Sequence, residues 1–432
     1  MPNLLRKETM PETNKEAVNK KSNGAQRNRD FLKIWAAETI SLFGSQITGL
    51  ALPLVAVTEL NASAFEMGLL RMFGQVPFPL FSLLAGVWLD RIRRRPVLMV
   101  SDFLRAILLL SIPIAAVLDQ LSLLQLYIVI FGVGTLSVAF EVAHFSYVPT
   151  LVPRDQLIEG NSKLQVSYSV AELGGPGVAG LLTQFISAPF AVLANTISYL
   201  FSGLLLGTIR TPEELQPPSK LPTSVWRDIV EGMRALMGHK ILQAIIISSV
   251  LSVTFGSALL SVYVLYLTRE LEFSPATIGF IFAAGGSAAV VGAIFAKRAA
   301  AKLGLGPAII SGWFVQGLAR LLIPLAAGPI AIPLLITAQV FTGGAGTIAN
   351  IHQWTFRQQV IPDRLLARVT ASQRFLVYGS STVGSFLGGV LGSWLGLNTT
   401  LWVCAVLGLL GPVYALFTPL RSLLQQSVVL AD

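Results

Sequence analysis

The chain of 432 residues is 53% hydrophobic and only 12% charged, and its mean hydropathy is +0.68. This composition is too apolar for a soluble globular protein and predicts a protein embedded in a lipid bilayer. The net charge of +9 does not indicate nucleic-acid binding, because the basic residues fall in short segments between apolar runs and in the N-terminal tail.

Residues 1–30 form a polar, basic segment ahead of the first apolar run. The segment contains no apolar stretch of the signal-peptide type. Its composition is typical of a chain that cannot bury a hydrophobic core. We therefore expect a disordered basic tail, with a second tail at residues 421–432.

Apolar windows punctuated by Gly, Pro and charged residues predict twelve membrane-spanning helices. Their expected starts are near Phe31, Phe65, Pro96, Ser122, Leu157, Pro189, Ile241, Ala276, Gly306, Ala331, Leu365 and Asn398. Arg and Lys gather in alternate inter-span segments, and acidic residues gather in the others. This asymmetry predicts that both termini are cytoplasmic.

The segment 209–240 is the longest between two spans, and it divides the chain into six-helix bundles at 31–208 and 241–420. Its first part is a proline-rich linker. Its second part spaces Trp226, Ile229, Met233 and Leu236 for one face of an amphipathic helix. We expect this helix to lie on the inner membrane surface, with partner binding as the alternative.

The two halves resemble each other in sequence. Residues 152–182 align without gaps onto 361–391, so that Pro153 meets Pro362 and Gly180 meets Gly389. A membrane chain with related halves is the arrangement in which a central site lies between two bundles that rock against each other. The expected fold is therefore an all-α membrane protein of two pseudo-symmetric six-helix bundles.

The run GVWLDRIRRR, from Gly86 to Arg95, is a charged turn between two long apolar runs. Gly86, Asp90, Arg91, Arg94 and Arg95 fit a pattern that resembles the loop between helices 2 and 3 of major facilitator superfamily transporters. Arg93 stands where that pattern usually has a second Gly.

The resemblance implies an inner gate at this turn. Asp90 can cap a helix across the two halves, and the arginines can pair with Asp102 or with backbone carbonyls. Asp102 can instead pair with Arg105 on its own helix. The alternative for the whole turn is orientation by positive charge alone.

A second signature lies in the fifth span, at Gly175, Pro176 and Gly180. It resembles the Gly-Pro motif of drug:proton antiporters in the same superfamily, which favours export over import. Such a segment bends a helix and lets a neighbouring helix approach closely. Close packing alone would also explain the glycines.

Four ionisable residues inside the spans are candidates for proton coupling, because each costs about 2.5–3.5 kcal/mol at the centre of a membrane helix. They are Glu38, Glu141, His144 and Glu172. Carboxylates beside an imidazole can hold a proton near neutral pH. The alternative is a polar cluster that only hydrogen-bonds the bundle, and Glu172 suits structural pairing equally well.

Spans 1, 4, 7 and 10 line the central cavity in the resembling superfamily, which implies that Glu38, Glu141 and His144 are neighbours. Arg71, Arg105 and Arg320 can counter the carboxylates or contact an anionic substrate. The further candidates for the cavity wall are Ser45, Ser137, Arg71, Asn350, Gln353 and Trp354. Trp354 can alternatively anchor its span at the membrane interface.

No signature of an enzyme, metal site or cofactor site is found in the sequence. It contains no phosphate-binding loop and no His-Glu-x-x-His run. Cys404 is the single cysteine, and the three histidines are widely separated, so we expect neither a disulfide nor a bound metal. We expect no cofactor and no enzymatic activity.

Three parts of the first half, the opening run RNRDFLKIWAAETISLFGSQITGLALPLVAV, the Gly86–Arg95 turn and the run SDFLRAILLLSIP, carry a second resemblance. They resemble the bacterial branch of the superfamily that contains enterobactin exporters and macrolide-efflux proteins. The resemblance implies secondary active efflux of an amphipathic small molecule, such as an antibiotic or siderophore, by a monomer in the bacterial inner membrane in exchange for protons. The alternatives are an importer or lysophospholipid flippase of the same fold, or a membrane sensor that transports nothing.

Overall fold

The computed structural model describes residues 29–82, 92–152, 157–211, 213 and 225–423. Within these residues the chain is helical and contains no strand. The helices of the first half, here the N-half, are α2 (Arg29–Thr58), α3 (Ala64–Gln75), α5 (Arg94–Val117), α6 (Leu123–Leu151), α7 (Leu157–Ile186) and α8 (Ala188–Gly207).

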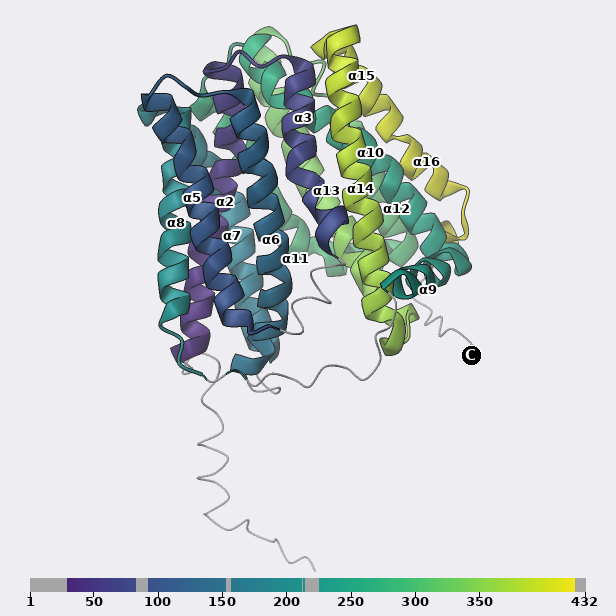
Figure 1. Ribbon diagram of the computed structural model, residues 1–432. Helices are drawn as coiled ribbons and strands as arrows, with labels where there is room; N and C mark the ends of the chain where they lie inside the picture. Colours follow the sequence, from purple (N-terminus) through teal and green to yellow (C-terminus); the bar gives the residue numbers. More distant parts are fainter. Residues whose placement is uncertain (1–28, 83–91, 153–156, 212, 214–224, 424–432) are drawn as a thin grey trace, which may run out of the picture.

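The helix α9 (Val225–Gly238) separates the N-half from the second half, here the C-half. The C-half consists of α10 (Lys240–Arg269), α11 (Pro275–Leu303), α12 (Leu305–Arg320), α13 (Ala331–Val360), α14 (Asp363–Leu395), α15 (Leu397–Gly408) and α16 (Leu410–Leu416), with short 3-10 turns at Gly328–Ile330 and Pro419–Ser422. The two bundles stand beside each other (Figure 1).

Each of the twelve expected starts lies within two residues of the start of a described helix. The short helix α16 has no expected start of its own and follows α15 within the last predicted span. In the described chain, nine segments are long and apolar enough to cross a membrane by themselves. The spans outside this group are α3 and α12, with 12 and 16 residues, and α7, which carries Glu159, Lys163 and Glu172.

The helix starts follow from local sequence. Ser63 accepts a hydrogen bond from the Glu66 backbone, and the Glu66 carboxylate accepts one from the Ser63 backbone, which forms a capping box ahead of α3. Ser122 and Ser274 cap α6 and α11 in the simpler way, through their hydroxyls. All three caps lie at the end of the bundle away from α9, which we call the distal end.

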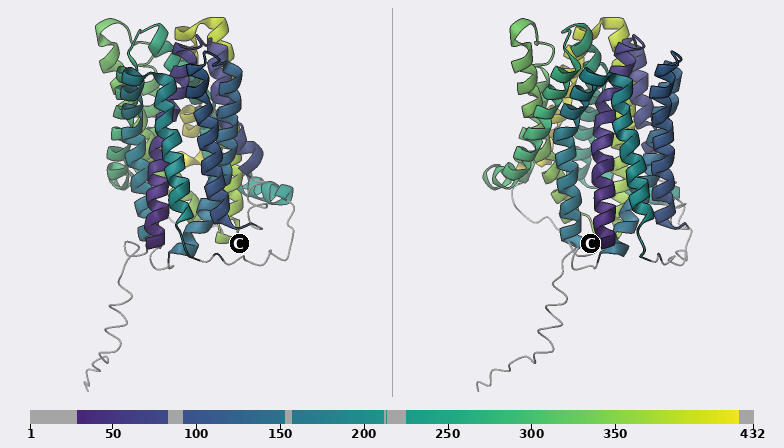
Figure 2. Two further views of the ribbon diagram at one scale, coloured as in Figure 1. Left: turned by 60° about the vertical axis from the view of Figure 1, so that its left-hand side comes forward. Right: turned by 90° about the vertical axis from the view of Figure 1, so that its left-hand side faces the viewer.

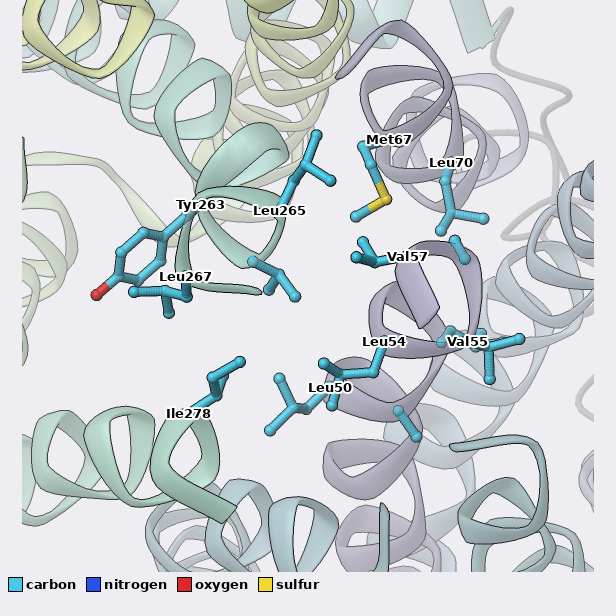
Figure 3. Close-up of a cluster of buried hydrophobic side chains, with 14 of the residues drawn as sticks. Leu50, Leu54, Val55, Val57, Met67, Leu70, Tyr263, Leu265, Leu267 and Ile278 are labelled. Carbon is cyan, nitrogen blue, oxygen red and sulfur yellow. The ribbon is translucent and has the colours of Figure 1, made fainter. Parts of the chain in front are cut away.

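The hydrophobic core is continuous between the halves at the distal end. One cluster joins Leu54 of α2 and Met67 of α3 to Leu265 of α10 and Ile278 of α11. These side chains point toward one another from four helices (Figure 3). Helices in a bilayer associate by close van der Waals packing, and this cluster supplies such packing between the two halves at the distal end.

At the opposite end, here the α9 end, the core is divided. One cluster, with Phe31 and Tyr147, lies inside the N-half, and another, with Leu242 and Phe356, lies inside the C-half. The ribbons of the halves diverge toward this end (Figure 1). The molecule is therefore closed at the distal end and parted at the α9 end.

Close helix approach at the distal end depends on glycine. A Cβ at Gly68 of α3 would lie 2.5 Å from the Cα of Gly389 in α14. A Cβ at Gly180 of α7 would lie 2.4 Å from the carbonyl oxygen of Pro275 at the start of α11. Both contacts join the N-half to the C-half, so small residues permit the distal closure.

The amphipathic helix predicted before the C-half is α9, which lies across the ends of the spans (Figure 2). It packs on α14, where a Cβ at Gly232 would lie 2.5 Å from the carbonyl oxygen of Arg368. Leu236 is buried in the C-half cluster, and Glu231 pairs with Arg368 at 2.5 Å. The helix is therefore attached to the C-half.

Candidate functional site

Two cavities lie next to each other between the helices. The cavity lined mostly by the N-half has a volume of about 650 Å³, and the one lined by the C-half about 460 Å³. Leu260 of α10 lines both. Phe78, just beyond α3, stacks on Tyr378 of α14 with ring centroids 4.4 Å apart. The cavities are therefore adjoining parts of one central space.

The structure places all the predicted cavity residues on these walls. Ser45, Arg71 and Ser137 line the N-half cavity, as do Glu172 and Pro176. Asn350, Gln353 and Trp354 line the C-half cavity. The three other predicted proton-coupling residues, Glu38, Glu141 and His144, are not among the described residues that line either cavity.

Glu38 of α2 and His144 of α6 face each other inside the N-half. Glu38 Oε2 and His144 Nε2 are 4.0 Å apart, which is close enough for an ion pair and too far for a hydrogen bond. Both atoms are buried and have no hydrogen-bond partner within the described protein. A proton on one of these two atoms would make it a hydrogen-bond donor to the other, and the bond would form if the side chains moved closer.

Glu141, also on α6, reaches the other half of the molecule. Its Oε1 accepts a hydrogen bond from Nη1 of Arg374 in α14 at 2.8 Å. The Arg374 guanidinium also lies 5.6 Å from the ring centre of Phe145 on α6. This ion pair and the Phe78–Tyr378 stack connect the halves on the α9 side of the distal core.

A buried ion pair lies between α5, α6 and α8. Asp102 Oδ1 accepts from Arg105 Nη2 at 2.5 Å, and Asp102 Oδ2 accepts from the Ser202 hydroxyl at 2.6 Å. The Arg105 guanidinium lies 4.4 Å from the ring centre of Phe140 and 4.2 Å from that of Tyr199. Among the described residues, Asp102 therefore pairs on its own helix and not with the arginines of the Gly86–Arg95 turn.

Arg71 of α3 and Glu172 of α7 are the charged residues on the described wall of the N-half cavity. No ion pair joins them within the described chain, and Arg71 Nε is buried without a hydrogen-bond partner. The opposite charges cancel in the net charge of this wall. The remainder of the wall is largely apolar, with side chains such as Leu50, Met67 and Ile130.

The Gly-Pro segment of α7 contacts helices of both halves. A Cβ at Gly175 would lie 2.3 Å from Cβ of Gln46 on α2, inside the N-half. Gly180 meets α11 of the C-half, and a Cβ at Gly279 of α11 would lie 2.5 Å from the carbonyl oxygen of Pro176. The segment therefore brings α7 close to α2 and to α11 at once.

Of the predicted gate residues, Gly86, Asp90 and Arg91 lie outside the described residues, whereas Arg94 and Arg95 begin α5. The backbone N–H groups of Arg94 and Arg95 donate to the Glu213 carboxylate at 2.7 and 3.3 Å. The Arg94 guanidinium lies 3.6 Å from the same carboxylate. Glu213, at the start of the linker, is therefore the acidic cap of α5.

Two further contacts secure this corner of the N-half. The Arg95 side chain donates to the carbonyl oxygens of Leu206 and Gly207 at the end of α8. Asp30 at the start of α2 accepts from the backbone N–H groups of Arg210 and Thr211. The first residues of the linker are thus fastened to α2, α5 and α8 together.

Replacing Glu213 with glutamine is expected to lower the free energy of unfolding by about 1–2 kcal/mol, because an anionic cap is lost from the N-terminus of α5. The change can be measured by titrating the purified protein from mixed micelles into SDS. Glu59→Gln is the matched control, because Glu59 is exposed at the distal end of α2. Equal stability of Glu213→Gln and the parent would show that the cap contributes nothing.

Arg357 of α13 also lines the C-half cavity. Four residues of the site are not predicted by the sequence patterns: Phe78, Glu213, Arg357 and Arg374. A signal existed for the two arginines, since both are ionisable residues within or near a predicted span. The partner of Arg374 depends on how α14 faces α6, which no local pattern specifies. The sequence around Glu213 predicts only a polar linker and gives no sign that this carboxylate caps a helix.

The arrangement of two helical bundles around central cavities is that of known membrane transporters. Two solved structures share the fold. One is a bacterial homologue of the lysosomal transporter Spinster in an inward-facing conformation, with a TM-score of 0.73 and 12% identity over 94% of this chain and 100% of that one. The other is a bacterial homologue of the iron transporter ferroportin, also inward-facing, with a TM-score of 0.68 and 16% identity over 91% of this chain and 99% of that one. The predicted all-α fold of two bundles is confirmed.

Residues 24–429 match the family described as "Transmembrane secretion effector", and the chain belongs to this family. It is 25% identical to the multidrug efflux pump Tap of Mycolicibacterium fortuitum, covering 91% of this chain and 96% of Tap. It is 26% identical to macrolide efflux protein A of Streptococcus pyogenes over 50% of this chain and 53% of that protein. Identity to the enterobactin exporter EntS of Shigella dysenteriae is 24%, covering 84% and 85%.

These relatives confirm the predicted branch of the superfamily. The protein is a multi-pass membrane transporter with bacterial relatives, and it is not an enzyme.

Proposed function

We propose that the protein exports an amphipathic small molecule by alternating access, in exchange for protons. The observation that carries the proposal is a central pair of cavities between two bundles that share a core at the distal end and separate at the α9 end. Such a state receives its substrate from the α9 side. Rocking of the bundles would then expose the cavities at the distal end.

The distribution of charge supports an α9 end in the cytoplasm. Basic side chains such as Lys33, Arg95 and Lys240 lie near that end of the helices, whereas Glu59 and Glu270 lie at distal helix ends. Cytoplasmic loops carry an excess of Lys and Arg. The family description and the names of the relatives, an efflux pump and two exporters of other compounds, support export as the direction.

Two pairs offer sites where a proton can act. Protonation of Glu141 would remove the charge that holds Arg374, and with it an ion pair between the halves. Protonation of His144 would create a cation 4.0 Å from the Glu38 carboxylate, within one bundle. Proton binding would thus change contacts between the halves at one pair and within the N-half at the other.

Export is tested in whole cells loaded with erythromycin, enterobactin, fluorescein or rhodamine 123. Cells that produce the protein are expected to lose at least one probe faster than cells that lack it, and a protonophore is expected to abolish the difference. A probe that accumulates inside the producing cells would indicate import and contradict the proposal. Equal rates of loss from both kinds of cell for every probe would contradict export of such compounds.

Coupling is tested with Glu38→Gln and Glu141→Gln in proteoliposomes. Both variants are expected to lose most of the transport driven by a pH gradient and to keep exchange of labelled for unlabelled probe, which needs no net proton movement. Glu159→Gln is the control, because Glu159 pairs with Lys163 one turn away on α7 and lines neither cavity among the described residues. Full gradient-driven transport in both variants would overturn the role given to these carboxylates.

A further inference from the structure

The C-half cavity has a strongly basic wall. Arg320 of α12, Arg357 of α13 and Arg374 of α14 all line it, and no Asp or Glu is among the described residues that do so. Arg374 is engaged with Glu141 from the other half. The positive charges of Arg320 and Arg357 therefore have no carboxylate on the wall to balance them.

The remaining contacts of these two arginines leave most of their donors free. Arg320 Nη1 donates to the carbonyl oxygen of Ser252 at 3.4 Å, and the guanidinium covers Gly256, where a Cβ would be 2.7 Å from Nη1. Arg357 is only 3% exposed and lies 4.6 Å from the ring centre of Trp354. A guanidinium has five N–H donors, and in the described chain neither residue forms an ion pair.

Neutral polar groups beside the arginines are also unsatisfied. The Ser252 hydroxyl and the Gln373 side-chain oxygen line this cavity, are buried, and have no hydrogen-bond partner within the described protein. Asn350 and Gln316 add further amides to the wall. Hydrogen-bonding groups from several helices thus converge on one space, as they do in sites that orient a polar group of a ligand. The Ser252 hydroxyl and the amide NH2 groups can donate to an anion, whereas the Gln373 oxygen only accepts.

Leaving two guanidinium groups unpaired inside a membrane protein is energetically unfavourable, and an anion is the ligand that offsets this cost most directly. Planar guanidinium groups bind carboxylate, sulfonate and phosphate oxygens through paired hydrogen bonds. A cationic ligand would instead be repelled. The wall of the C-half cavity therefore selects for negative charge.

We propose that the C-half cavity binds the anionic group of an amphipathic substrate through Arg320 and Arg357. The apolar body of the same substrate lies in the adjoining N-half cavity, against Leu50, Met67 and Ile130. The proposal rests on the proposed export function and names its substrate class: organic anions with a sizeable apolar portion. The anionic group can belong to a soluble compound or to a lipid headgroup.

The proposal is tested by binding of fluorescein and rhodamine 123 to the full chain in phosphatidylcholine nanodiscs. The two dyes share a xanthene ring system and carry opposite charge at neutral pH. Fluorescence anisotropy is expected to show tighter binding of fluorescein. Arg320→Gln and Arg357→Gln are each expected to weaken it by about 10- to 100-fold, the loss of one charge-assisted interaction, and the Lys variants by less.

Arg298→Gln is the matched control, because Arg298 of α11 is exposed, lies over Phe295, and lines neither cavity among the described residues. It is expected to bind fluorescein as the parent does. Palmitoyl-lysophosphatidylglycerol and monopalmitoylglycerol serve as competitors. Displacement of fluorescein by the anionic lipid alone would assign the site to lipid headgroups as well, and no displacement by either would assign it to soluble anions.

The two proposals fail in different ways. If fluorescein binding depends on Arg320 and Arg357 but no probe leaves the cells, the anion site stands and the export function falls. If fluorescein is exported at the parent rate by Arg320→Gln and Arg357→Gln, export stands and the anion site is overturned. Equal affinity for fluorescein and rhodamine 123, unchanged in both Gln variants, would also overturn it.

Discussion

Replacing Asp102 with alanine is expected to lower the free energy of unfolding by about 3–5 kcal/mol, because Arg105 would remain as a buried and unpaired charge. The side chains of Asp102 and Arg105 are 0% and 5% exposed, so solvent cannot take over the role of the carboxylate. Ser202 would lose its acceptor as well. Titration into SDS, followed by circular dichroism, measures the change.

Two controls separate this effect from a general sensitivity of charged residues. The double variant Asp102→Leu/Arg105→Met is expected to recover most of the stability, since a buried ion pair can be exchanged for apolar side chains at little cost. Glu159→Gln, which breaks the partly exposed i, i+4 pair with Lys163 on α7, is expected to change stability by less than about 0.5 kcal/mol. An Asp102→Ala protein as stable as the parent would refute the assignment of a buried pair.

Replacing Gly389 with valine is expected to reduce transport by about 10- to 100-fold by preventing closure of the distal end. A Cβ at this position would lie 2.8 Å from the Cα of Gly68 and 3.1 Å from the carbonyl oxygen of Ala64. Backbone atoms of another helix cannot turn aside as a flexible side chain can. Overpacking of this kind costs about 1–3 kcal/mol, which here falls only on the distally closed state.

The shift is measured with a cysteine at Leu260, which lines both cavities, in a Cys404→Ala background. A membrane-impermeant thiol reagent added from the distal side is expected to label the Gly389→Val protein faster than its parent. Gly379→Val is the control on the same helix, because a Cβ at Gly379 meets no atom within 4 Å. Equal labelling of the two valine variants would contradict the prediction.

The architecture could be predicted because each part of it depends on local sequence. The apolar runs place the spans, and serines such as Ser63 and Ser274 mark the starts of helices. Charge asymmetry between loops predicts an orientation, and the alignment of 152–182 with 361–391 predicts related halves. Each of these signals can be found without knowing which helices contact each other in the folded protein.

The site could be predicted only in part, because its pairings are made between helices. The sequence places Asp102 and Arg105 three residues apart on one helix, so their spacing alone predicts the local pair that the structure contains. The partner of Glu141 is Arg374, 233 positions later in the chain, and nothing near either residue indicates the other. The same holds for Phe78 and Tyr378.

The attachment of α9 to α14, together with that of Glu213 to α5, sets a length limit on the transport cycle. Each bundle holds one end of the covalent connection between them, at Glu213 and at Val225, and eleven residues of sequence separate these two ends. A polypeptide of that length reaches at most roughly 40 Å when fully extended. The connection is therefore a tether whose reach bounds how far the two bundles can part at the α9 end.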